Sequence, residues 1–237
     1  MTDAMDRDRC AAPPGGIELE NVEFRYPGTD YRLRVPRLAI AAGTRSAIVG
    51  PSGAGKTTLL HGLAGILPVT TGMLRVDGFE LHRASAAERR RFRSERVGLI
   101  FQEFELLEHL TVRENILLPF LLQRGHPSAP TAEHRMQALT ERSGIQRYLT
   151  RKPARLSQGE RQRVALCRAL IVEPRVVLAD EPTGNLDPAT TDRVLDSLFD
   201  EIALHGATLV MVTHDHSLLP RFDRVIDLPT IQNGVVP

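Results

Sequence analysis

The chain has 237 residues, enough for one large domain or for a domain with an inserted lobe. Its formal net charge of +1 and its 42% hydrophobic content are ordinary for a globular protein, so neither indicates bulk binding to nucleic acid or to an anionic membrane. The two cysteines form no disulfide framework and have no metal spacing, which favours a reducing compartment such as the cytoplasm. No apolar stretch approaches the ~20 residues that cross a bilayer, so we expect no direct membrane insertion.

The chain opens with a polar stretch that ends in Ala-Ala-Pro-Pro-Gly-Gly, and we expect a disordered leader over residues 1–16. From Ile17 to Tyr26 apolar and polar residues alternate, with one slip near Asn21. This period is typical of a strand with one buried face. Further strands are predicted over 34–40, 46–49 and 73–76.

An arginine-rich helix is predicted over 84–96, with Ser85 as its N-cap and Glu88 as the capping-box partner. Its five arginines could form a patch for nucleic acid or a solvated helix face. We favour the solvated face, because no aromatic residues are interleaved with the arginines, and we expect no nucleic-acid partner.

The rest of the chain alternates helices with short, fully apolar strands. Strands are predicted over 97–101, 176–179 and 209–212, and helices over 156–172, 190–204 and 111–144, the last broken at Pro119 and over 125–130. Strands that are apolar on both faces predict a parallel sheet covered on both sides, and the earlier alternating strands predict a separate antiparallel lobe. We therefore predict an α/β domain over 17–237 with a helical subdomain inserted at about 103–160.

A glycine-rich segment follows the strand at 46–49 and fits the phosphate-binding pattern G-x-x-x-x-G-K-[ST]. Glycines let the backbone N–H groups surround a polyphosphate, and the next helix adds the positive end of its dipole. Lys56 can reach the terminal phosphates, and the Thr57 hydroxyl can ligate Mg²⁺. Lysine occurs only at positions 56 and 152, so a compact ammonium has been kept here among many arginines. The predicted phosphate cradle comprises Gly50, Pro51, Ser52, Gly53, Ala54, Gly55, Lys56, Thr57 and Thr58.

Polar residues end three later strands, at Gln102, Asp180-Glu181 and His214. Ligands of such sheets sit at the carboxyl ends of the strands, so these side chains are expected near the phosphate cradle. Asp180 can hold Mg²⁺ directly or through water, and Glu181 can accept a proton from an attacking water. Taken singly, Gln102 could cap a strand, the acids could lie in a turn and His214 could be structural. Together, downstream of a phosphate cradle, they favour a nucleotide-hydrolysing site.

The signature segment, residues 156–163, reads Leu-Ser-Gln-Gly-Glu-Arg-Gln-Arg and resembles the signature of ATP-binding-cassette (ABC) ATPases, usually Leu-Ser-Gly-Gly-Gln. The resemblance covers Ile17 to about Asp227. It implies a P-loop NTPase with a RecA-like parallel-sheet core, an N-terminal antiparallel β lobe and an inserted α-helical subdomain. It also implies hydrolysis of ATP with Mg²⁺, and a second ABC subunit as partner.

The resemblance gives roles to single residues. Tyr26 resembles the aromatic residue that stacks on adenine, although the neighbouring Tyr31 could serve instead. Gln102 resembles the glutamine that contacts Mg²⁺ and couples to the membrane partner, and His214 the histidine that contacts the γ-phosphate. The segment Asn185-Leu186-Asp187 resembles the loop that meets the opposite subunit. The implied catalytic residues are Lys56, Glu181 and His214, and the implied metal site comprises Thr57, Gln102 and Asp180.

Within the signature segment, the resemblance implies that Ser157 and Gly159 contact the γ-phosphate bound by another subunit. The same residues also read as a helix N-cap, with Glu160 as the capping-box partner of Ser157, and the two interpretations are compatible. Gln158 and Glu160 replace the family's usual glycine and glutamine. A positive φ at Gln158 would strain a non-glycine residue, and Glu160 would bring a negative charge near a phosphate.

Segments 114–119, 159–165 and 179–187 resemble the lipoprotein-releasing and macrolide-exporter branch, with the cell-division ATPase as a close relative. This implies an integral membrane permease as partner, and a cytoplasmic chain held at the inner face of the membrane through it. Residues 228–237 lack the family's usual closing strand and turn. The alternatives are a regulatory ATPase of a cell-division-type membrane complex, a DNA-repair ABC ATPase, a P-loop kinase and a regulatory scaffold that binds ATP and hydrolyses little. The span 57–156 lacks the heptads or Cys clusters of the repair class, and a kinase has no need of the signature segment.

Overall fold

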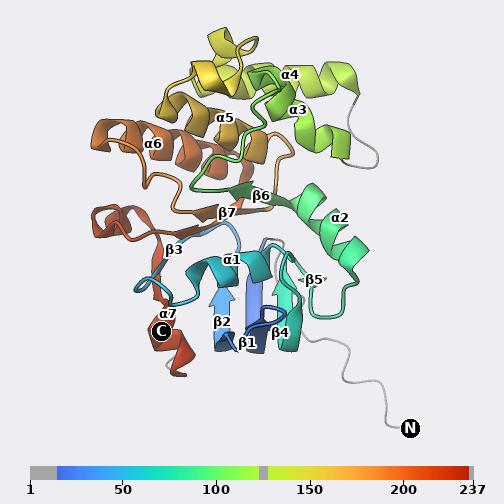
Figure 1. The fold of residues 1–237 in the computed structure, drawn as a ribbon, viewed down its shortest axis with the longest axis vertical. Helices are drawn as coiled ribbons and strands as arrows, with labels where there is room; N and C mark the ends of the chain where they lie inside the picture. Colours follow the sequence, from blue (N-terminus) through green and yellow to red (C-terminus); the bar gives the residue numbers. More distant parts are fainter. Residues whose placement is uncertain (1–14, 123–127, 235–237) are drawn as a thin grey trace.

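Two β-sheets lie on either side of helix α1 (Lys56–Leu63), and longer helices cover the far face of the second sheet (Figure 1). The computed structural model describes residues 15–122 and 128–234. Leu59, Leu60 and Leu63 of α1 are buried and belong to a core shared with both sheets. None of the described helices is both long and apolar enough to span a bilayer.

The first sheet is antiparallel and has the strand order β2-β1-β4-β5. Its strands are β1 (Ile17–Arg25), β2 (Arg32–Ile40), β4 (Val69–Val76) and β5 (Phe79–Glu80). The predicted slip in β1 is real, because Asn21 has a φ of 50° and the pairing with β4 shifts between Glu20 and Glu23. A Cβ at Gly72 of β4 would collide with the Asn21 carbonyl, so only glycine fits opposite this bulge.

The second sheet is parallel and has the strand order β6-β7-β8-β3-β9. Its strands are β6 (Val97–Ile100), β7 (Val176–Asp180), β8 (Thr208–Val212), β3 (Arg45–Val49) and β9 (Arg224–Asp227). Alternate residues of β7 belong to two hydrophobic cores. Val177 and Ala179 pack with the longer helices on the far face of the sheet, whereas Val176 and Leu178 pack with α1 and the first sheet. The predicted α/β architecture, with a doubly covered parallel sheet and an antiparallel lobe, is therefore confirmed.

Of the helices that follow α1, the last lies beside β2, and the others lie around or beyond the parallel sheet (Figure 1). They are α2 (Ala86–Arg96), α3 (Val112–Leu122), α4 (Ala129–Arg142), α5 (Gln158–Leu170), α6 (Pro188–His205) and α7 (Leu228–Gln232), with short 3-10 turns η1 (Gln146–Tyr148), η2 (Pro153–Arg155) and η3 (His216–Arg221). The prediction that Pro119 breaks the helix is wrong, because α3 continues through it. Ile116 and Phe120 of α3 are buried in the core that α5 also enters, and this packing outweighs the lost hydrogen bond.

Helix α2 has the predicted capping box. Ser85 accepts from the Glu88 N–H, and the Glu88 carboxylate accepts from the Ser85 N–H at 2.8 Å. Three of its five arginines bond to other parts of the fold or along the helix: Arg96 bonds Asp77 at 2.6 Å, Arg91 bonds Glu95 at 2.8 Å, and Arg93 donates to two carbonyls at the end of α1. These contacts are consistent with a solvated helix face and give no support to a patch for nucleic acid.

Both ends of the folded chain differ from the sequence prediction. Residues 1–14 of the predicted leader lie outside the described residues, but Gly15 and Gly16 are buried and belong to the fold. The Gly15 N–H donates to Asp77 at 2.6 Å, and its carbonyl accepts from the Thr208 hydroxyl at 2.7 Å. At the other end, β9 extends the parallel sheet and α7 follows it directly, with Asp227 as its N-cap. The strand β9 was not predicted, and residues 228–234 contain no strand, as the sequence indicated for this stretch.

Candidate active site

The phosphate loop joins β3 to α1. Three of its glycines have positive φ: Gly50 at 152°, Gly53 at 79° and Gly55 at 97°. Gly55 is the N-cap of α1 and makes no side-chain cap, so the first N–H groups of the helix point into the loop without a side-chain partner. This is the arrangement that binds phosphate at a helix N-terminus.

Lys56 is buried at the first position of α1. Its ammonium donates to the carbonyls of Gly50 and Pro51 at 2.9 and 3.0 Å, so it lies against the backbone of the loop. Helix α7 supports the same loop from outside, because the Gln232 amide donates to the Ala54 carbonyl at 2.8 Å. Sequence analysis missed Gln232, and no motif marks it.

A cavity of about 470 Å³ opens in front of the loop, a size typical of ligand pockets. It brings together residues of the phosphate loop, the end of β6 and the end of β7. The residues that line it are Tyr31, Ser52, Gly53, Gly55, Lys56, Thr57, Thr58, Gln102, Asp180 and Glu181. The strand-end residues predicted at Gln102, Asp180 and Glu181 thus meet the phosphate loop in space. Gly50, Pro51 and Ala54 belong to the loop but do not line the cavity.

Thr57 and Asp180 both line this cavity and together offer it a hydroxyl and a carboxylate. Burial raises the pKa of Asp180, and the hydrogen bond from Thr57 opposes that rise. A hydroxyl and a carboxylate beside phosphate oxygens are the ligands that Mg²⁺ prefers, so the donor set fits this ion.

Glu181 occupies a strained position at the end of β7. Its φ is 44°, a conformation that is rare for a residue with a side chain. Its carboxylate lies 3.0 Å from Nδ1 of His214. Besides the phosphate cavity, Glu181 lines a second hollow of about 480 Å³ together with His214 and Leu186. Strain of this kind is common at active sites, where surrounding structure holds a side chain in one place.

The two candidate tyrosines have different surroundings. Tyr31 lines the phosphate cavity and is 37% exposed, and a Cβ at Gly55 would collide with its hydroxyl. Tyr26 instead packs against the core of the first sheet, and its hydroxyl lies 3.3 Å from Nδ1 of His61. The rings are 6.4 Å apart, so both tyrosines remain candidates for the base-stacking role predicted for Tyr26.

The signature segment carries the predicted capping box without strain. Gln158 is the first residue of α5 and is not among the residues with positive φ, so the expected strain is absent. The Glu160 carboxylate turns back to accept from the Ser157 N–H at 2.8 Å. A hydrogen bond from the Tyr148 hydroxyl lowers the pKa of Glu160, and the Tyr148 ring lies between two arginines. No sequence motif pointed to Tyr148.

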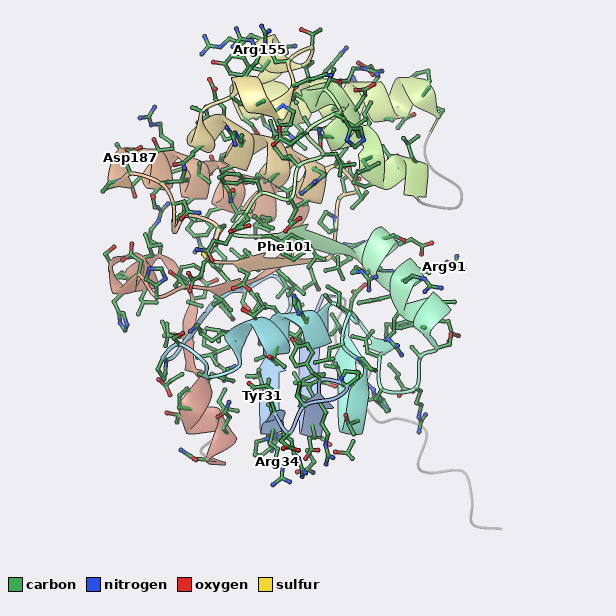
Figure 2. All side chains as sticks on the ribbon, in the orientation of Figure 1. Tyr31, Arg34, Arg91, Phe101, Arg155 and Asp187 are labelled. Atoms are coloured by element: carbon green, nitrogen blue, oxygen red, sulfur yellow. The ribbon has the colours of Figure 1, made fainter. Side chains whose placement is uncertain are left out.

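The signature segment and the start of α6 form a common outer surface. A Cβ at Gly159 would lie 2.6 Å from Cγ2 of Thr190, so glycine allows the two helix N-termini to approach closely. Ser157 and Asp187, the N-caps of these helices, are both exposed, and Figure 2 shows Asp187 at the edge of the molecule. Ser157, Gln158, Gly159, Glu160 and Asp187 do not line the phosphate cavity of their own chain.

A phosphate loop between a parallel strand and a helix, with Asp180 and Glu181 at the end of a nearby strand, defines a P-loop NTPase. The family model for the ABC transporter matches residues 33–184. The chain belongs to the ABC transporter family and is an ATP-binding, ATP-hydrolysing subunit.

Known relatives cover most of the chain. It is 42% identical to the lipoprotein-releasing system ATP-binding protein LolD of Legionella pneumophila. The alignment spans 191 residues, which are 81% of this chain and 83% of the relative. It is 45% identical over 215 residues to the uncharacterized ABC transporter ATP-binding protein YbbA of Escherichia coli, and this alignment covers 90% of this chain and 93% of the relative.

Solved structures show the same fold. The dimeric structure of MJ0796, a bacterial ABC transporter cassette, aligns with a TM-score of 0.79 at 32% identity and covers 89% of this chain and 93% of that one. A dimeric post-hydrolysis state of MJ0796 bound to ADP and phosphate aligns with a TM-score of 0.78 at 30% identity, with the same coverage.

Proposed function

We propose that the chain works as one half of an ATP-driven homodimer, in which each ATP lies between the phosphate loop of one copy and the signature segment of the other. The observation that carries this proposal is the separation of the two halves of the site. Lys56, Asp180 and Glu181 share a cavity, whereas Ser157 lies exposed outside it. The MJ0796 relative forms a dimer, which supports the same arrangement.

Each residue then has a defined task in hydrolysis. The N–H groups of the phosphate loop and the Lys56 ammonium bind the phosphates, and Glu181 accepts a proton from the water that attacks the γ-phosphorus. His214 orients the Glu181 carboxylate through the 3.0 Å contact and can donate to the γ-phosphate. Thr57, Asp180 and Gln102 would hold Mg²⁺. The ion would neutralise charge on the phosphates.

Complementation between two inactive variants tests the shared site. Lys56→Ala removes the phosphate ligand, and Ser157→Asp keeps an N-cap but places a negative charge against the γ-phosphate. A heterodimer of the two has one doubly damaged site and one intact site. With random pairing at an equal mixture, we expect recovery of about one quarter of the parent's ATP turnover, because about half of the dimers are mixed.

Ser85→Asp is the matched control, since Ser85 opens α2 with the same capping box as Ser157 but lies outside the signature segment. Alone, it should hydrolyse ATP at the parental rate. If the mixture of Lys56→Ala and Ser157→Asp gave no recovery at any ratio, the phosphate contact between copies would be excluded.

We further propose that an integral membrane permease of the lipoprotein-release or macrolide-export type docks on a second surface, the α2–α3 groove. This cavity of about 840 Å³ is walled by α2, α3, α5 and the end of β6. Its apolar floor includes Leu99, Phe101 and Leu118, and its rim includes Arg91; Figure 2 shows Phe101 and Arg91. Through this partner the chain would be peripheral at the cytoplasmic face of the membrane. The relation to LolD supports this choice of partner.

Two leucines on α3 test the docking surface. Leu118 lines the α2–α3 groove, whereas Leu121 on the same helix is 75% exposed and does not line it. We expect Leu118→Asp to abolish co-purification of the ATPase with its permease from detergent-extracted membranes, because a charge in an apolar contact is costly. The Leu121→Asp variant should co-purify with the permease as well as the parent does. Equal retention of both variants would place the permease elsewhere.

A further inference from the structure

Arg168 in α5 joins the signature helix to the segment that follows β6. Its guanidinium donates to the Phe104 carbonyl at 2.7 Å and also to the Glu105 carbonyl. A guanidinium presents a rigid fork of donors, so one side chain can hold two successive carbonyls in a fixed orientation.

The backbone that Arg168 holds is strained. Phe104 and Glu105 have φ values of 44° and 49°, and two successive non-glycine residues rarely adopt this conformation. Residues in such conformations persist only where the surrounding structure holds them, and they concentrate at functional sites. In this chain the two carbonyl contacts of Arg168 supply such a restraint.

The strained segment connects the two surfaces described above. Gln102, at one end, lines the phosphate cavity, and Glu105, at the other end, lines the α2–α3 groove. Arg168 also lines this groove, and it belongs to α5, the helix that begins directly after Ser157. Arg168 is therefore a direct link between the segment and α5.

We propose that Arg168 is a positioning residue: its two hydrogen bonds hold the segment 103–105 so that Gln102 reaches the phosphate cavity, and they couple that segment to the signature helix. The inference rests on the proposed function, because it assigns Gln102 a role in the hydrolytic site. Arg168 itself touches no phosphate in this arrangement and acts through the backbone of Phe104 and Glu105.

The test compares Arg168→Met with Arg168→Lys and with a control. Methionine keeps the aliphatic length of the side chain and removes both donors, whereas lysine keeps one donor group. Arg135→Met is the matched control, because Arg135 of α4 also makes a contact distant in sequence, with Glu173 in the turn after α5 (3.0 Å), but lines neither the phosphate cavity nor the groove. The readouts are kcat, the Kd of a fluorescent ATP analogue, and amide hydrogen exchange over residues 103–106.

For Arg168→Met we expect kcat to fall roughly 10- to 100-fold, the scale on which misplacing a reacting group acts, with a Kd within about 2-fold of the parent. Exchange over 103–106 should quicken, and Arg168→Lys should lie between the parent and Arg168→Met in both readouts. Arg135→Met should match the parent.

Parental turnover in Arg168→Met would overturn the inference, and so would a slow variant with parental exchange over 103–106. In either case Lys56→Ala and Ser157→Asp would still complement each other, so the proposed function would stand. Absence of that complementation would contradict the proposed function, whatever the turnover of Arg168→Met.

Discussion

Replacing Glu181 with glutamine is expected to slow ATP hydrolysis by ~10²–10⁴-fold, the scale on which the loss of a general base acts, while ATP still binds. The amide has nearly the same shape as the carboxylate but cannot take a proton from water. It can keep the 3.0 Å contact with His214, and glutamine meets the same cost as glutamate at a φ of 44°. The fold around the site should therefore survive, and phosphate release under saturating ATP measures the effect.

The same variant should accumulate as an ATP-bound dimer, because closure around ATP no longer ends in hydrolysis. Gel filtration with light scattering would show it. Glu133→Gln makes the same chemical change at a carboxylate of α4 that pairs with Arg113 of α3, and it should behave like the parent. A Glu181→Gln protein that stays monomeric in ATP and turns over normally would refute the assignment of the base.

The parts of the site that the sequence could predict are those fixed by topology. Once the strand before Gly50 and the strand before Asp180 belong to one parallel sheet, their carboxyl ends meet at the same edge, and the side chains that follow them converge. The α/β architecture followed from the same apolar strands. Local rules succeeded for the capping boxes at Ser85 and Ser157, since both partners lie within four residues.

The features that the sequence did not predict depend on contacts between residues that are far apart in the chain. Pro119 reads as a helix breaker, yet burial of its neighbours against α5 keeps α3 continuous. Spacing could not rank two tyrosines five residues apart, so the sequence did not show that Tyr31 lines the cavity, and the base-stacking role of Tyr26 stays a prediction. The contacts of Gln232 with the phosphate loop and of Arg168 with Phe104 each bridge more than sixty residues of chain. Only the assembled core brings such pairs together.

Removing the Lys56 ammonium is expected to abolish the thermal stabilisation that ATP gives the parent. A ligand present at 100 times its Kd stabilises the folded state by about 2.7 kcal/mol. For a chain of this size that corresponds to a rise in Tm of roughly 5–10 °C. Lys56→Ala should show no rise, because in the proposed function the buried ammonium at the start of α1 is the cation that binds the phosphates. Thermal melts with and without Mg-ATP measure the difference.

The chain supplies its own control, since its other lysine, Lys152, is exposed just before η2 and lines no part of the phosphate cavity. Lys152→Ala should be stabilised by ATP as strongly as the parent. The comparison uses the shift of each variant relative to its own ATP-free melt, because the Lys56 ammonium also satisfies the Gly50 and Pro51 carbonyls and its loss can lower Tm by itself. If ATP raised the Tm of Lys56→Ala as much as that of Lys152→Ala, the ammonium would have no part in binding phosphate.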